Sequence, residues 1–199
     1  MNLHLVDLEG DIVSAWLEAF AHFPEVRIHC GDLFAIARHC VVSPANSYGF
    51  MDGGIDAAYR AFFGPQIERT VRDAVTRRPE GHLPVGASLV VRTGHQAVPY
   101  MIVAPTMTMP ESVESRNCYR AMMAILRIAG ADAEVGLDVF CPGLATGVGM
   151  VPPRNAAAMM AEAYRDWKRS LEPDASPISG SATRSGGSGF TEGPPLPVS

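Results

Sequence analysis

An amide and a carboxylate, Asn46 and Asp56, lie on either side of a loop that contains Gly49, Gly53 and Gly54. A carboxylate such as that of Asp56 can accept a proton or align a water molecule. The first turn of a helix also favours an aspartate through the helix dipole alone, so a structural role stays open. Asn46 is likewise either a ligand contact or a turn residue that tolerates a left-handed backbone.

These two residues must be positioned by a strand over 40–43 and a helix that begins near Ile55. The strand ends in the sequence SPAN, and the helix follows the pattern IDAAYRAFF. A glycine-bearing loop between a strand and a helix presents unpaired backbone N–H groups at the positive end of the helix dipole. The segment therefore predicts a phosphate site.

A second glycine loop, Gly143–Gly149, follows an apolar strand over 135–141 and precedes a helix over 154–168. Such a loop is a weak signal by itself, and its place between a strand and a helix strengthens it. Two loops of this kind predict a ligand that carries a diphosphate.

The remaining pattern alternates strands with helices. Strands are expected at 2–7, 26–30, 40–43, 87–92, 100–104 and 135–141, with helices at 12–20, 55–63, 115–128, 154–168 and from Pro65 onward. This alternation indicates a three-layer α/β/α sandwich with a mixed, mostly parallel sheet. In such sheets ligands bind beyond the carboxyl ends of the strands, where both glycine loops fall.

Length and composition indicate one folded domain over 1–171, because 199 residues with 47% hydrophobic content can bury one core. Residues 172–199 are rich in Gly, Ser and Pro and are predicted to form a disordered tail. The alternative is a short partner-binding motif near 194–197, and the sequence does not identify its partner.

The net charge of −5 argues against binding to nucleic acid, which usually requires a basic face. No apolar run is long enough to span a bilayer, so we expect a cytoplasmic protein without a membrane partner. The four cysteines are scattered without metal-ligand spacing and are read as buried, reduced thiols. Neither a metal nor another cofactor is predicted.

The order of these motifs resembles that of a macro domain. It consists of GDL at 31–33, VSPAN ending at Asn46, a loop ending in GGID, and GLATGVG at 143–149. The resemblance covers about residues 27–168. That family binds ADP-ribose, and some of its members hydrolyse ADP-ribosyl bonds.

The resemblance implies a role for each motif. Asp32 would accept a hydrogen bond from the adenine amino group, although an aspartate there also caps turns. Asn46 would bind the distal ribose, and Asp56 would orient or activate the attacking water. The two loops would hold the diphosphate, with a hydroxyl donor from Thr146. The implied ligand-binding residues are Asp32, Leu33, Asn46, Gly53, Gly54, Ile55, Ala145, Thr146, Gly147, Val148 and Gly149, and the implied catalytic residues are Asn46 and Asp56.

The chain departs from the family pattern at several places. Ser43 and Pro44 replace the first residues of the usual N-A-A-N, and Asp52 replaces a glycine, facing either solvent or the modified group. The second loop lacks an aromatic residue, for which Met150 or Tyr48 is a candidate substitute. The family's final strand has no counterpart, and we expect 3–6, in an extra N-terminal strand and helix, to fill its place.

Three functions follow from this pattern. The first is hydrolysis of ADP-ribosyl linkages to acidic side chains or to small molecules. The second is a non-catalytic reader of ADP-ribose, which the missing aromatic and the Ser43-Pro44 replacement favour. The third is a binder of another nucleotide metabolite, given Asp52.

Overall fold

The computed structural model describes residues 1–172, which build one six-stranded sheet. The strand order is β2-β1-β6-β3-β5-β4, and all neighbours are parallel except β4 and β5. The strands are β1 (Asn2–Asp7), β2 (Arg27–Cys30), β3 (Cys40–Ser43), β4 (Leu89–Arg92), β5 (Tyr100–Val103) and β6 (Asp138–Cys141).

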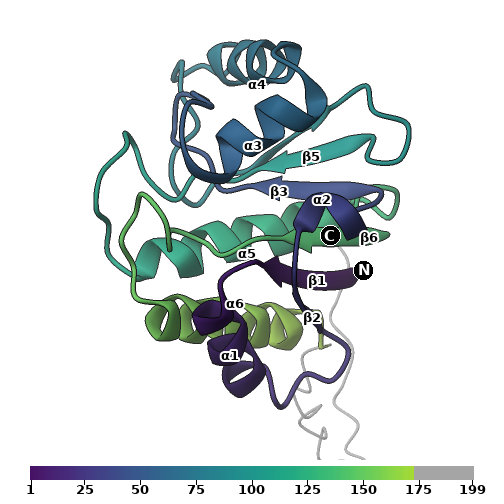
Figure 1. The fold of residues 1–199 in the computed structure, drawn as a ribbon, viewed down its shortest axis with the longest axis vertical. Helices are drawn as coiled ribbons and strands as arrows, with labels where there is room; N and C mark the ends of the chain where they lie inside the picture. The colour runs from purple at the N-terminus through teal and green to yellow at the C-terminus, as the bar shows by residue number, and fades with distance from the viewer. Residues whose placement is uncertain (173–199) are drawn as a thin grey trace, which may run out of the picture.

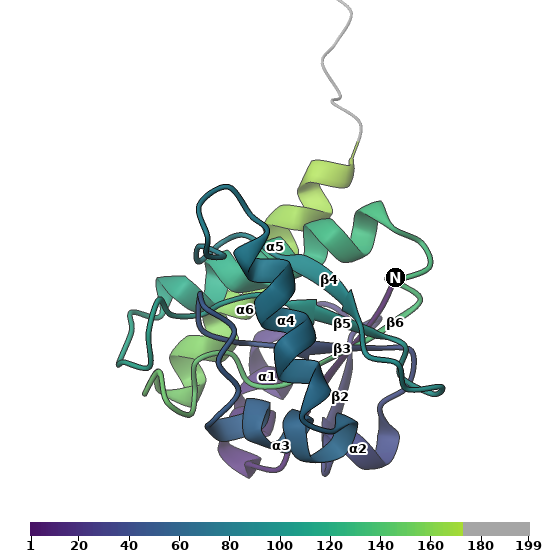
Figure 2. The same ribbon diagram turned by 90° about the horizontal axis from the view of Figure 1, so that it is seen from above.

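Helices cover both faces of this sheet (Figure 1). The helices are α1 (Gly10–Ala19), α2 (Leu33–Ile36), α3 (Gly54–Phe63), α4 (Gln66–Thr76), α5 (Arg116–Ala131) and α6 (Pro153–Leu171). Side chains of α1, α5 and α6 share a core with one face, and those of α2, α3 and α4 share a core with the other. Seen from above, α4 lies over the strands (Figure 2). The predicted three-layer α/β/α sandwich with a mixed, mostly parallel sheet is confirmed.

Each strand sends alternate side chains to the two faces, as the two-residue period of a strand requires. In β1, Leu3 and Leu5 belong to the core under α1, α5 and α6, whereas Val6 belongs to the opposite core. Phe140 of β6 faces the same side as Val6. The inner strands β1, β6, β3 and β5 are therefore buried on both faces, which explains their almost continuous apolar runs, whereas the edge strands β2 and β4 are partly exposed.

The N-terminal strand β1 lies inside the sheet, between β2 and β6. Leu5 pairs with Ile28 on one side and with Cys141 on the other. Helix α1 then packs on the sheet and on α6, with Trp16 fully buried and its indole N–H donating to Met160 Sδ at 3.4 Å. The extra N-terminal strand and helix expected from the sequence are confirmed, and within residues 1–172 no strand follows α6.

The structure corrects several details of the sequence prediction. Strand β6 begins at Asp138 instead of 135, because Asp132 accepts hydrogen bonds from the amides of Glu134 and Val135 and holds them in a turn. Helix α2 is an addition that the hydrophobic pattern did not indicate. Cys30, at the end of the edge strand β2, is exposed instead of buried, whereas the other three cysteines are buried. The predicted tail lies outside the described residues.

No helix within residues 1–172 has both the length and the apolar character needed to cross a bilayer.

Candidate ligand cleft

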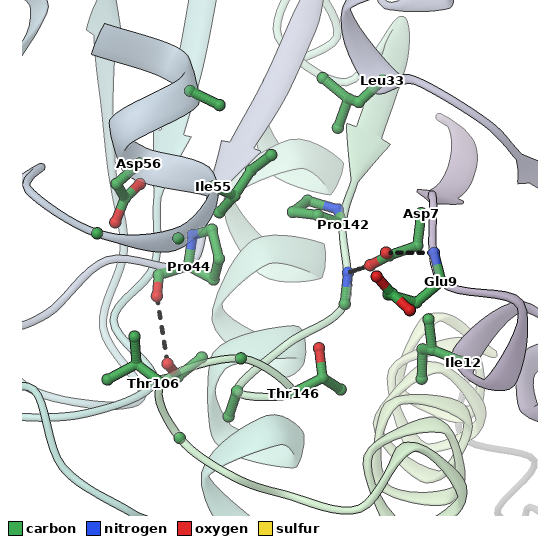
Figure 3. A pocket seen from close by; sticks show the side chains of 18 of the residues that line it. Asp7, Glu9, Ile12, Leu33, Pro44, Ile55, Asp56, Thr106, Pro142 and Thr146 are labelled. Carbon is green, nitrogen blue, oxygen red and sulfur yellow. Dashed lines mark hydrogen bonds between the residues drawn. The ribbon is translucent and has the colours of Figure 1, made fainter.

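A cleft of about 750 Å³ opens at the carboxyl ends of four adjacent parallel strands, β2, β1, β6 and β3 (Figure 3). The structure brings every ligand-binding and catalytic residue predicted from the sequence to its wall. These residues are Asp32, Leu33, Asn46, Gly53, Gly54, Ile55, Asp56, Ala145, Thr146, Gly147, Val148 and Gly149. What each of them does there stays a prediction.

The first glycine loop leads directly into α3. Gly53 is the N-cap and has no side chain to satisfy the first amides of the helix. In the part of the chain that the structure describes, the amides of 53–56 have no hydrogen-bond acceptor. A Cβ added at Gly53 or Gly54 would meet no atom within 4 Å, so the backbone faces open space. Four amides at the positive end of a helix are therefore available to an anion.

The second glycine loop follows β6 and is closed at its base by backbone hydrogen bonds. The amide of Val151 donates to Ala145 O at 3.0 Å, and the amide of Met150 donates to Gly147 O at 2.9 Å. Among residues 1–172, the amides of 146–149 find no acceptor. Gly149 is tightly packed, because a Cβ there would lie 2.7 Å from Ala145 O. This loop thus offers a second set of four amides to the cleft.

Asp56 is a buried carboxylate on the first turn of α3, with 7% of its surface exposed. The hydroxyl of Ser43, at the end of β3, donates to Asp56 Oδ1 at 2.6 Å. Burial raises the pKa of Asp56 to about 7, the Ser43 hydrogen bond opposes that rise, and the negative charge of Asp52 adds to it. A pKa of about 7 lies in the range that favours general acid–base catalysis at neutral pH.

The side chain of Asn46 holds the loop that contains it. Its Oδ1 accepts hydrogen bonds from the amides of Tyr48 at 3.1 Å and Phe50 at 3.2 Å, and its Nδ2 donates to Phe50 O at 2.8 Å. Both lone pairs of the oxygen and one of the two N–H groups are thus used. Only one N–H is left, so Asn46 can donate one hydrogen bond to a ligand and cannot accept any.

Asp32 is the N-cap of α2, since its Oδ1 accepts a hydrogen bond from the amide of Phe34 at 2.9 Å. This is the turn-capping alternative that the sequence left open. The side chain is also exposed and lines the cleft, so its second oxygen is compatible with a ligand contact.

The turn between β1 and α1 is a wall of the cleft that the sequence motifs missed. Asp7, Leu8, Glu9, Asp11 and Ile12 all line it, and Asp7 Oδ2 accepts a hydrogen bond from the amide of Gly143 at 3.0 Å. The sequence did contain a signal for this wall. Because β1 is a parallel strand, its carboxyl end must lie at the same edge of the sheet as the glycine loops. The strand order, which the sequence did not supply, was needed to use it.

Among the described residues, the aromatic rings of Phe34 and Phe50 line the cleft, whereas Tyr48 and Met150 do not. The Arg72 guanidinium lies over the Phe50 ring at 4.6 Å from its centre. The sequence offered Tyr48 and Met150 as substitutes for the missing aromatic residue of the second loop, and neither of them lines the cleft.

The wall of the cleft is acidic. It contains six carboxylates, those of Asp7, Glu9, Asp11, Asp32, Asp52 and Asp56, and within the described residues no Lys, Arg or His lines it. An anionic ligand would therefore be held by uncharged donors, chiefly backbone amides, instead of by cationic side chains of the described residues.

These features define an α/β/α protein whose cleft is lined by two loops with unpaired backbone amides in the described chain, and comparisons identify its family. Residues 42–160 match the family model of the Macro domain. An uncharacterized protein of Aquifex aeolicus is 34% identical over 145 residues, which are 72% of this chain and 83% of that protein. The chain belongs to the Macro domain family.

Other relatives and solved structures agree with this. A protein of Escherichia fergusonii named O-acetyl-ADP-ribose deacetylase is 27% identical, over 71% of this chain and 80% of its own length. The macrodomain of Mycobacterium tuberculosis DarG has the same fold with a TM-score of 0.58 and 21% identity, over 68% of this chain and 87% of its own. An Oceanobacillus iheyensis macrodomain with ADP has a TM-score of 0.57 and 18% identity, over 68% of this chain and 72% of its own.

Proposed function

We propose that the cleft binds ADP-ribose with its diphosphate between the two amide loops. The observation that carries this proposal is the pair of four-amide sets, 53–56 and 146–149, which belong to residues that line one cleft and have no acceptors of their own in the described chain. A diphosphate has acceptors for both sets, whereas one phosphate has acceptors for one. A mutant of the Oceanobacillus iheyensis macrodomain that was solved with ADPR supports the choice of ligand.

In this orientation the adenine lies toward Asp32 and Leu33, at the end of β2, and the distal ribose lies toward Asn46 and Asp56. The strand order supports this assignment, since β1 and β6 separate the end of β2 from the end of β3. The single N–H that Asn46 retains donates to a ribose hydroxyl.

We propose further that the protein hydrolyses esters of ADP-ribose, either with acidic side chains or with small acids. Asp56 takes a proton from the attacking water and returns it to the departing oxygen. One water is consumed, and ADP-ribose and a carboxylic acid are released. A pKa near 7 suits both transfers, because the group can hold or release a proton at neutral pH. The relative named O-acetyl-ADP-ribose deacetylase supports this class of reaction.

The second candidate is a reader that binds ADP-ribose without turnover. It is favoured by Asn46, whose amide is largely committed to its own loop and can contribute only one donor to a water or a ribose. The second loop also lacks an aromatic residue that would cover the ribose.

Release of ADP-ribose from an aspartate- or glutamate-modified protein and from O-acetyl-ADP-ribose distinguishes these candidates. We expect turnover by the full chain and a loss of about a hundredfold or more in Asp56→Asn, because the isosteric amide cannot accept the proton. Asp73→Asn, which makes the same charge change on the exposed surface of α4, serves as the control.

Binding without release of ADP-ribose from either substrate would leave the reader as the function. Turnover that survives Asp56→Asn would remove Asp56 from the mechanism.

A further inference from the structure

Asp7 connects the N-terminal turn to the second glycine loop. Its Oδ2 accepts a hydrogen bond from the amide of Gly143 at 3.0 Å, and its Oδ1 accepts one from the amide of Glu9 at 3.1 Å (Figure 3). The two carboxylate oxygens thus join the end of β1, the start of α1 and the first residue of the loop.

Hydrogen bonds hold the carbonyls of this loop, whereas the amides of 146–149 have no acceptor in the described chain. Gly147 O accepts from the amide of Met150 at 2.9 Å, and Gly149 O accepts from the amide of Val113 at 3.0 Å. The far end is closed by the bond from Val151 to Ala145, and the near end by the bond from Gly143 to Asp7. A Cβ at Gly143 would lie 2.9 Å from Asp7 Oδ2 and 2.6 Å from Thr146 Oγ1, so the contact is close on both sides.

The charge of Asp7 is unfavourable beside a diphosphate, since like charges repel in a site with few counter-ions. Glu9 and Asp11 carry the same charge on the same wall, yet within residues 1–172 their side chains make no hydrogen bond or ion pair. Asp7 differs from them because both of its oxygens are used by backbone amides. The Asp7 carboxylate therefore holds the loop to the end of β1 through hydrogen bonds.

We propose that Asp7 is a positioning residue that holds the second amide loop in the orientation required for the diphosphate. The N-terminal strand, which lies outside the region matched by the family model, thereby becomes part of the ligand site. This inference rests on the proposed binding of ADP-ribose.

The test is calorimetry with ADP-ribose on the full chain and on Asp7→Asn, with Asp11→Asn and Glu9→Gln as charge-matched controls. Asparagine has nearly the shape of aspartate, but it has a single acceptor oxygen and cannot satisfy both amides. We expect Asp7→Asn to bind about tenfold more weakly, the effect of one lost charge-assisted hydrogen bond. The controls remove a repulsive charge, so their affinity should not fall.

Gly143→Ala crowds both Asp7 Oδ2 and Thr146 Oγ1, so it should weaken binding at least as much as Asp7→Asn does. Because the two changes share the contact between Asp7 and Gly143, the loss in the double variant should be smaller than the sum of the two single losses. Hydrogen exchange at the amides of 143–149, measured without ligand, should be faster in Asp7→Asn than in Asp11→Asn.

The outcomes separate the two proposals. Absence of ADP-ribose binding by the wild type overturns the proposed function, and the exchange measurement still decides whether Asp7 orders the loop. Wild-type binding with an unchanged affinity in Asp7→Asn, or with an equal loss in Asp11→Asn, overturns the role of Asp7. Failure of both Asp7→Asn and Gly143→Ala to fold also overturns it, because the bridge would then serve the fold instead of the site.

Discussion

The Ser43 and Asp56 pair shows how a replacement in a motif changes chemistry at one residue. Ser43 is completely buried and donates its hydroxyl to the carboxylate. Three influences then act on the pKa of Asp56, of which burial is the largest and raises it, Ser43 lowers it, and Asp52 raises it. The ionisation of the candidate base is therefore adjusted by two neighbours that can be changed one at a time.

Ser43→Ala and Asp52→Asn should move the pH profile of hydrolysis in opposite directions. The rate should rise with pH through about 7 as the carboxylate forms. Removing the Ser43 hydroxyl disfavours the carboxylate and should move this rise to higher pH by about one unit. Removing the Asp52 charge favours the carboxylate and should move it to lower pH.

The measurement is the steady-state rate of ADP-ribose release between about pH 5 and pH 9, a range that extends to both sides of neutral pH. If neither variant shifts the pH profile of the rate, the rise in rate with pH is caused by the ionisation of another group.

At the scale of elements, the N-terminal strand is central although it lies outside the family match. The side chains of Leu3, Leu5 and Val6 are almost completely buried, and both edges of β1 are paired. Deleting 1–21 would leave two unpaired strand edges and a large apolar surface. Such a chain should not fold.

Leu5→Ala should lower the free energy of unfolding by about 3 kcal/mol, because it opens a cavity in the core between β1 and α1. Leu17→Ala is the matched control, since Leu17 in α1 has 60% of its surface exposed, and it should change stability by less than about 1 kcal/mol. Urea unfolding measures both variants. A cooperative transition in the protein lacking 1–21 would contradict a central role for β1.

Local patterns were enough to predict most elements and the two glycine loops, which form part of the cleft wall. The strand over 2–7 and the two glycine loops follow from alternation and from turn residues, which are properties of neighbours in sequence. Asp7 and Phe50 could not be assigned in this way, because their positions depend on the strand order and on the path of a loop. The commitment of the Asn46 amide to its own loop also depends on tertiary geometry.

At the scale of the whole molecule, the cleft combines an acidic wall with amide donors. The chain has a net charge of −5, and the six carboxylates in the wall add a local repulsion toward a diphosphate. Affinity must then come from short-range hydrogen bonds, while long-range electrostatics oppose the approach of the ligand.

Raising the salt concentration should therefore leave ADP-ribose affinity unchanged or increase it by about twofold, since salt screens repulsion between separated charges. Titrations at low and high sodium chloride measure this effect. A phosphate site built from Lys and Arg would weaken instead, and a marked loss of affinity with salt would contradict binding by uncharged donors.

The most direct test of the two-loop site is a calorimetric comparison of ADP-ribose with AMP on the full chain. AMP retains the adenine and one phosphate, so it can engage only one of the two amide sets. ADP-ribose should bind at least about tenfold more tightly, because it adds the second phosphate and the distal ribose. Equal affinity for the two ligands would contradict a diphosphate held between 53–56 and 146–149.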